Sequence, residues 1–81
     1  MAEGRAIRVD FQNADASGRV RLNTVGALED LSAKSIDLEP GLRLRLLDGE
    51  LSADGEAAWN AEEGLWVAAV DWDEVIRPPL G

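Results

Sequence analysis

The chain has 81 residues and a formal net charge of -8, with 16 acidic and 8 basic side chains, no cysteine and no histidine. A chain of this length folds as one small domain with a limited core. The absence of cysteine and histidine excludes disulfide bridges, thiolate nucleophiles, imidazole bases and the usual zinc ligands.

The charge is unevenly distributed along the sequence. Residues 1–47 carry seven basic and seven acidic side chains, whereas residues 48–81 carry nine acids and Arg77 as their single base. A strongly negative surface disfavours nucleic acid and anionic membranes as partners and favours basic ones. The N-terminus lacks the pattern of a signal peptide, and no apolar stretch approaches the roughly 18 residues of a spanning helix. We therefore expect a cytoplasmic protein.

The first segment with a clear period is residues 6–12, which alternate apolar and polar side chains. This period indicates a half-buried strand with Ile7, Val9 and Phe11 facing inward. Turn-forming residues follow, and residues 19–23 resume the alternation. The two strands are therefore predicted to pair as a hairpin with a loop of about six residues.

The period changes after Asn23, because apolar side chains now recur every three residues. This spacing predicts a short amphipathic helix over residues 25–34, capped by Asn23 or Thr24. Such a short helix is unstable alone, so Leu28 and Leu31 are expected to pack on the sheet.

The second half of the chain reads as three strands separated by turns. The turn-forming residues 39–42 precede a strand over 42–46, in which leucines alternate with two outward-facing arginines. The Asp-Gly pairs at 48–49 and 54–55 predict further turns.

The last two predicted strands form a hairpin around residues 61–64. The strand over residues 55–60 places Ala57 and Trp59 on the inner face, and the strand over residues 65–73 follows. One face of this last strand carries Trp66, Ala68, Val70 and Trp72. After two prolines, residues 78–81 are predicted to be a loose tail, which leaves residues 1–77 as the domain.

The resulting order is strand, strand, helix, strand, strand, strand. We predict a mainly β fold with one short helix, as a small five-stranded SH3-like barrel or a rolled antiparallel sheet. The motifs of residues 42–49 (LRLRLLDG), 55–60 (GEAAWN) and 65–76 (LWVAAVDWDEVI) resemble small bacterial SH3-like barrel proteins. That resemblance implies a binding or accessory module. Because the chain has no tyrosine, it lacks the Tyr-lined groove used for polyproline recognition.

The candidate binding residues are arginines that the alternation places outward on three predicted strands, together with one tryptophan. They are Arg8, Arg19, Arg21, Arg43, Arg45 and Trp59. If the strands are neighbours, the arginines form a basic stripe able to bind carboxylates or phosphates. The alternative is cross-strand pairing with Asp10, Glu56 and other local acids, which would neutralise them. Trp59 is the tryptophan expected to reach the surface, because its neighbours are small.

No catalytic signature is present, and we predict that the chain is not an enzyme, since a nucleophile with its base is missing. The loop at Asn13, Asp15, Ser17 and Gly18 matches the opening of a calcium loop, but its closing position is Thr24 rather than glutamate. We interpret it as a hairpin tip whose polar side chains bond their own backbone. The acids at 71, 73 and 74 are interpreted as a solvated rim. Neither a metal nor a cofactor is predicted.

The sequence therefore predicts a small acidic module that contacts a partner protein. RNA or ribosome binding through an arginine face is the alternative, in which case binding would weaken steeply with salt. A small ligand-binding protein or enzyme would need a pocket that the sequence does not announce.

Overall fold

The computed structural model describes residues 5–75. In chain order these residues form β1 (Ala6–Arg8), β2 (Val20–Arg21), α1 (Val25–Ala33), β3 (Arg43–Asp48), β4 (Leu51–Asn60), β5 (Leu65–Val70) and the 3-10 turn η2 (Trp72–Glu74). The mainly β class and the predicted order of strands and helix are confirmed. The predicted tail over 78–81 lies outside the described residues.

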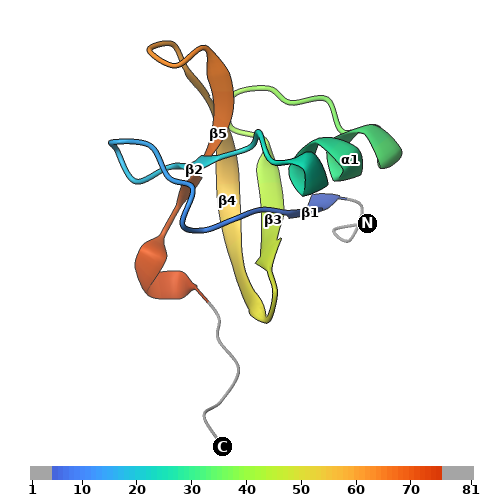
Figure 1. Cartoon of the computed structure of the whole chain (residues 1–81), viewed down its shortest axis with the longest axis horizontal. Helices are drawn as coiled ribbons and strands as arrows, with labels where there is room; N and C mark the ends of the chain where they lie inside the picture. Colours follow the sequence, from blue (N-terminus) through green and yellow to red (C-terminus); the bar gives the residue numbers. More distant parts are fainter. Residues whose placement is uncertain (1–4, 76–81) are drawn as a thin grey trace, which may run out of the picture.

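The five strands form one open, mixed sheet in the order β1-β3-β4-β5-β2 (Figure 1). β1 runs parallel to β3, and the other neighbouring pairs are antiparallel. The sheet is not closed into a barrel, because β1 and β2 form its two edges. The predictions of a closed barrel and of a fully antiparallel sheet are therefore wrong.

The predicted pairing of residues 6–12 with residues 19–23 is also wrong. Ile7 lies opposite Leu46 on β3, while Val20 lies opposite Ala68 on β5. The alternation fixes which face each side chain occupies, but it carries no information about the neighbouring strand. The alternation itself is confirmed, because the inward-facing residues of the first segment are all buried.

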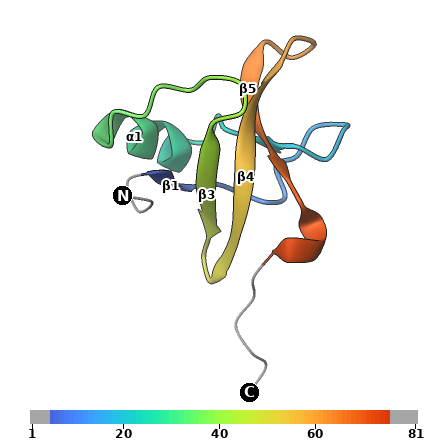
Figure 2. The same cartoon turned by 180° about the vertical axis from the view of Figure 1, so that it is seen from behind.

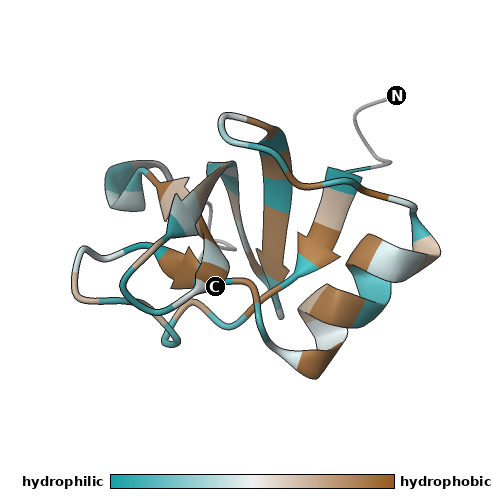
Figure 3. Cartoon of the chain, turned by 90° about the horizontal axis from the view of Figure 1, so that it is seen from above, coloured by the Kyte–Doolittle hydropathy of each residue, from teal (hydrophilic) through white to brown (hydrophobic). Residues whose placement is uncertain are grey.

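The core occupies the inner face of the sheet, defined here as the face that carries Ile7, Leu46 and Ala68. These three residues are completely buried. Apolar and polar segments interleave along the strands and the helix (Figure 3), as expected for elements with one covered face. Val67 is also fully buried, although its position in the ladder places it on the outer face.

Helix α1 begins after Thr24, whose side-chain oxygen accepts a hydrogen bond from the Ala27 backbone N–H (3.2 Å). The predicted helix and cap are confirmed. Leu31 packs against the core, but Leu28 is 54% exposed, so its predicted burial is wrong. The helix lies beside the edge strand β1, with Gly26 against Arg8, and Ala27 is the helical residue that becomes buried.

β4 is the longest strand, and it continues through the Asp-Gly pair at 54–55, where a turn was predicted. Gly55 is buried, and a Cβ there would lie 2.9 Å from Leu46 Cδ1. Close packing, rather than a turn, therefore requires this glycine. The predicted turn at 48–49 is present, with Gly49 at a φ of 60°. The turn at 39–42 is confirmed by the Leu42 N–H bond to the Glu39 carbonyl (3.1 Å).

β5 is shorter than the predicted strand over residues 65–73, because the chain leaves the sheet after Val70. The Trp72 indole N–H donates to the Gly18 carbonyl (2.9 Å), and its ring stands edge-on to Phe11 at 5.8 Å. These contacts draw η2 towards the loop before β2. Figures 1 and 2 show η2 turned away from the tip of the β3–β4 hairpin. Among the described residues, no helix is long and apolar enough to cross a membrane.

Candidate functional site

Each of the five candidate arginines forms an ion pair with an acid close to it in the fold. The pairs are Arg8 with Glu29 and Asp30, Arg19 with Asp15, Arg21 with Glu63, Arg43 with Glu56, and Arg45 with Asp54. Local pairing, the alternative to an open basic stripe, is therefore what the structure contains. Glu56 is one of the predicted partners, whereas Asp10 instead accepts a bond from the Gln12 N–H.

Arg8 belongs to the contact between α1 and the edge of β1. Asp30 accepts from both the backbone N–H (2.8 Å) and the Nε (2.9 Å) of Arg8. The side-chain bond from Arg8 is the main reason that the pKa of Asp30 lies below its ordinary value. Lys34 donates to the Ala6 carbonyl. Two backbone groups on the free edge of β1, the Arg8 N–H and the Ala6 carbonyl, are thus bound by helix side chains, which assigns Arg8 a structural role.

Arg19 and Arg21 belong to a polar network around the buried Asp15 carboxylate. Asp15 accepts from the backbone N–H groups of Ser17 and Arg19 (2.9 Å each) and from the side chains of Arg19 (3.1 Å) and Asn60 (2.9 Å). The bond from the Arg19 backbone is the largest cause of its lowered pKa. The four donors account for both carboxylate oxygens, and the two backbone donors are of the kind that the hairpin-tip interpretation predicts.

Glu63 extends this network to the β4–β5 turn. The Glu63 carboxylate accepts two hydrogen bonds of 2.7 Å from the Arg21 side chain. This hydrogen bonding is the largest cause of the lowered pKa of Glu63. Asn60 is buried and bridges Asp15 to the N–H of Glu63. The network therefore ties the loop before β2 onto the outer face of the sheet, the face on which Val67 is buried. Among the described residues, no three acidic side chains gather to hold a metal ion.

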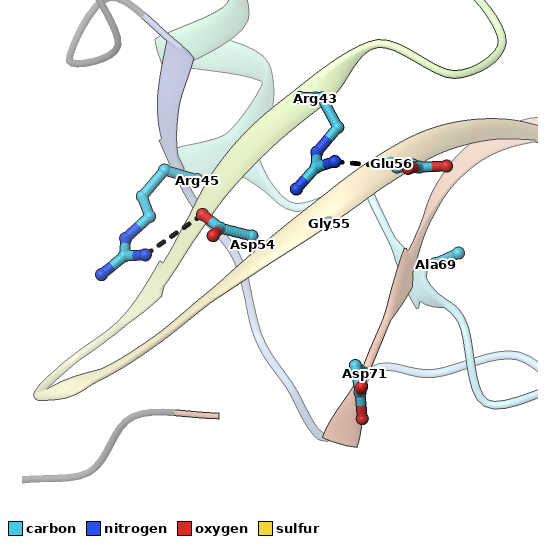
Figure 4. Close-up of a pocket in the computed structure, with 7 residues that line it drawn as sticks. All are labelled: Arg43, Arg45, Asp54, Gly55, Glu56, Ala69 and Asp71. Atoms are coloured by element: carbon cyan, nitrogen blue, oxygen red, sulfur yellow. Dashed lines mark hydrogen bonds and ion pairs between the residues drawn. The ribbon is translucent and has the colours of Figure 1, made fainter. Parts of the chain in front are cut away.

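Arg43 and Arg45 are the two candidates that lie together, and they border a hollow of about 390 Å³ on the outer face of the sheet (Figure 4). We call it the outer hollow. Its lining consists of Arg43, Arg45, Asp54, Gly55, Glu56, Ala69 and Asp71. Figure 4 shows the two arginines with their partner acids on one side and Ala69 and Asp71 on the other.

The outer hollow follows from the register of three strands. Arg43 lies opposite Glu56, and Glu56 lies opposite Ala69, so the row of side chains ends in a methyl group. The short Ala69 side chain leaves space beyond the charged pairs. In the next row, Arg45 lies opposite Asp54.

The two ion pairs that border the outer hollow are solvent-exposed and contribute little to stability. Arg43 Nη1 is 3.7 Å from Glu56 Oε2, which is too long for a hydrogen bond. Arg45 Nη1 is 3.1 Å from Asp54 Oδ1, and 61% of that aspartate side chain is exposed. Exposed pairs of this kind contribute about 0–1 kcal/mol each, so their carboxylates remain able to accept a further cation.

Asp71 is the acid of the outer hollow that is not matched by a basic residue within 5–75. It follows the last residue of β5, and its Oδ1 accepts a hydrogen bond of 3.0 Å from the Asp73 N–H. Counting Arg43, Arg45, Asp54, Glu56 and Asp71, the lining has one more acid than bases. A cationic group is therefore the ligand that would balance it.

Trp59 lies apart from the outer hollow, near the end of β4 and in the inner-face register. It is 49% exposed, and its ring stands edge-on to Trp66 at 5.4 Å, with 73° between the planes. Its exposure agrees with the expectation that it reaches the surface. The structure does not bring it together with any of the five arginines.

Ala69 and Asp71 are site residues that the sequence did not single out. The sequence predicts Asp71 only as part of an acidic rim, and Ala69 carries no signal of its own because a small residue indicates a hollow only once its neighbours are known. The signal that could have found them is the strand register, which aligns Ala69 with Glu56.

No protein-family model, curated protein or solved structure matches the chain. The resemblance to SH3-like barrels therefore stays a prediction, and any functional proposal rests on the geometry alone.

Proposed function

We propose that this chain is a binding module that holds a basic segment of a partner protein in the outer hollow. The observation that carries the proposal is Asp71, a carboxylate beside the small Ala69 with no basic partner among the described residues. A lysine or arginine side chain lying over Ala69 would continue the alternation of charges across the three strands.

The charge of the whole chain supports the same class of partner. A net charge of -8 steers basic molecules towards the surface and repels polyanions. RNA binding through the arginines is less well supported, because each candidate arginine already lies beside at least one carboxylate. A phosphate group would have to displace that carboxylate.

The test is calorimetric titration with a lysine octapeptide near 0.15 M salt, where charges more than about 8 Å apart are largely screened. Replacing Asp71 with asparagine should weaken binding about two- to fivefold, as expected for one exposed charge contact of up to about 1 kcal/mol. Asparagine can still accept the bond from the Asp73 N–H, so η2 keeps its cap.

The matched control is Asp37→Asn, which removes the same charge from the exposed segment between α1 and β3. This variant should bind the peptide like the unmodified chain. Equal weakening by both substitutions would show that the peptide responds only to net charge. No binding to the unmodified chain would end the proposal.

A further inference from the structure

Both edge strands of the sheet, β1 and β2, have backbone groups that are bound by other parts of the chain. On β1, Asp30 accepts from the Arg8 N–H, and Lys34 donates to the Ala6 carbonyl. On β2, the Arg21 N–H donates to the Asn13 carbonyl (2.8 Å). Uncovered strand edges pair readily with other chains, so such covering blocks association at these two places.

A third edge arises because β4 is longer than its neighbour β5. β4 pairs with β3 from Leu51 onwards, but it pairs with β5 only from Gly55 onwards. Residues 51–53 therefore have a partner strand on one side alone, because the register of β5 still places Asp71 opposite Asp54. This edge is left unpaired because the chain leaves the sheet at Asp71. The Trp72 indole N–H then donates to the Gly18 carbonyl in the loop before β2.

The backbone groups at this third edge follow from the ladder. The Ala57 N–H donates to the Leu42 carbonyl of the segment leading into β3, so odd-numbered residues of β4 bond towards β3. Ser52 therefore directs its N–H and C=O to the opposite side. Within residues 5–75, no other backbone group outside the strands bonds to Ser52. The side-chain oxygen of Ser52 accepts from Arg45 Nη2 (3.3 Å), so it does not cover the edge.

We propose that the basic segment of the partner binds in extended form, as an added antiparallel strand beside residues 51–53 of β4. The inference rests on the proposed function and specifies its binding mode. Two independent features support it: the unpaired edge at Ser52, and the adjoining outer hollow with Asp54 and Asp71 on the outer face. Main-chain hydrogen bonds would supply affinity, and side chains at alternate positions would supply specificity.

The two faces of the added strand would meet different surroundings. Side chains on the outer face would lie next to Asp54 and Asp71 and would be basic. Those on the inner face would lie next to the partly buried Leu51, which packs against the core, and would be apolar. The partner segment is therefore an extended stretch in which basic and apolar residues alternate.

The test compares two peptides of the same charge with the full chain. One is an octapeptide of alternating lysine and valine, and the other is the same peptide with N-methyl groups on the lysine backbone nitrogens. In an antiparallel pair the lysine opposite Ser52 shares its face and exchanges N–H and C=O bonds with it, so the lysine backbone groups are the ones that would bond to Ser52. We expect the unmodified peptide to bind at least tenfold more tightly and to slow amide exchange of Ser52 severalfold.

The outcomes separate this inference from the proposed function. Equal binding of both peptides, or unchanged exchange at Ser52, would overturn strand addition while leaving a basic-segment site in the outer hollow. Failure of both peptides to bind would overturn strand addition and the proposed function together.

Discussion

Asp15 is a charged side chain that is buried and fully hydrogen-bonded in this small chain. Four donors surround its carboxylate, and two of them come from the backbone of its own loop. Because Asn60 is one of the donors, the same carboxylate fixes the loop before β2 to the far end of β4. A residue that matches a calcium motif in sequence is thus used as a hydrogen-bond acceptor.

Acid should destabilise the fold through Asp15, Asp30 and Glu63. All three have a folded-state pKa below the ordinary value. Their contribution is therefore present above the unfolded-state pKa of about 4 and is lost as the pH falls through the folded-state values. We expect the urea concentration at the midpoint of unfolding to decrease as the pH is lowered from 6 to 2.5.

The variant Asp15→Asn should have a shallower pH dependence of the urea midpoint, because one of the three contributing carboxylates is gone. A pH profile parallel to that of the unmodified chain would show that Asp15 does not titrate differently in the folded and unfolded states.

Gly55→Ala should destabilise the fold by about 1–2 kcal/mol. The new Cβ would lie 2.9 Å from Leu46 Cδ1 and 3.2 Å from the Ala69 carbonyl oxygen. Overpacking of this kind costs about 1–3 kcal/mol, part of which is offset by the lower backbone entropy of alanine in the unfolded chain. Urea denaturation measures the change.

The second substitution Leu46→Val separates the steric clash from other effects of Gly55→Ala. It removes the crowded methyl group, so the double variant should lose less stability than the sum of the two single variants. Strict additivity would show that the clash with Leu46 is not the cause.

For the secondary-structure elements, the sequence predicted which side of each strand is buried better than it predicted which strands pair. Alternation correctly placed Ile7, Val9 and Phe11 inward, and the capping residue Thr24 correctly marked the start of the helix. Strand pairing could not be read in the same way, because the parallel contact of β1 with β3 joins residues about 39 positions apart (Ala6 with Arg45). The predicted burial of Leu28 is wrong for a related reason, because α1 covers the edge strand β1 rather than a face of the sheet.

Removing the helix side chains that cover β1 should expose that edge. Asp30→Ala combined with Lys34→Ala leaves the Arg8 N–H and the Ala6 carbonyl without their partners. We expect concentration-dependent association of this double variant in sedimentation velocity, since an open edge pairs with other strands.

The control for edge exposure is Glu29→Ala on the same helix, because Glu29 contacts only the Arg8 side chain. It should remain in the same association state as the unmodified chain. Monomeric behaviour of the double variant at every concentration would contradict a protective role for α1.

At the scale of the whole molecule, the uneven charge of the sequence becomes a pattern of local neutralisation. The candidate arginines of the first half are matched by acids, three of which, Asp15, Glu29 and Asp30, come from the same half. Acids left without a basic partner in the described residues include Glu50, Glu62 and Asp71. Composition therefore predicted the sign of the exposed charge, whereas its position in the outer hollow depended on strand register.

A chemical-shift titration of the 15N-labelled chain with the lysine octapeptide tests most directly whether the outer hollow binds basic segments. We expect the amides of Asp54, Glu56, Ala69 and Asp71 to shift, while the same concentration of a glutamate octapeptide or of oligouridylate leaves them in place. Shifts confined to the surroundings of Trp59, or an equal response to oligouridylate, would contradict a site for basic segments in the outer hollow.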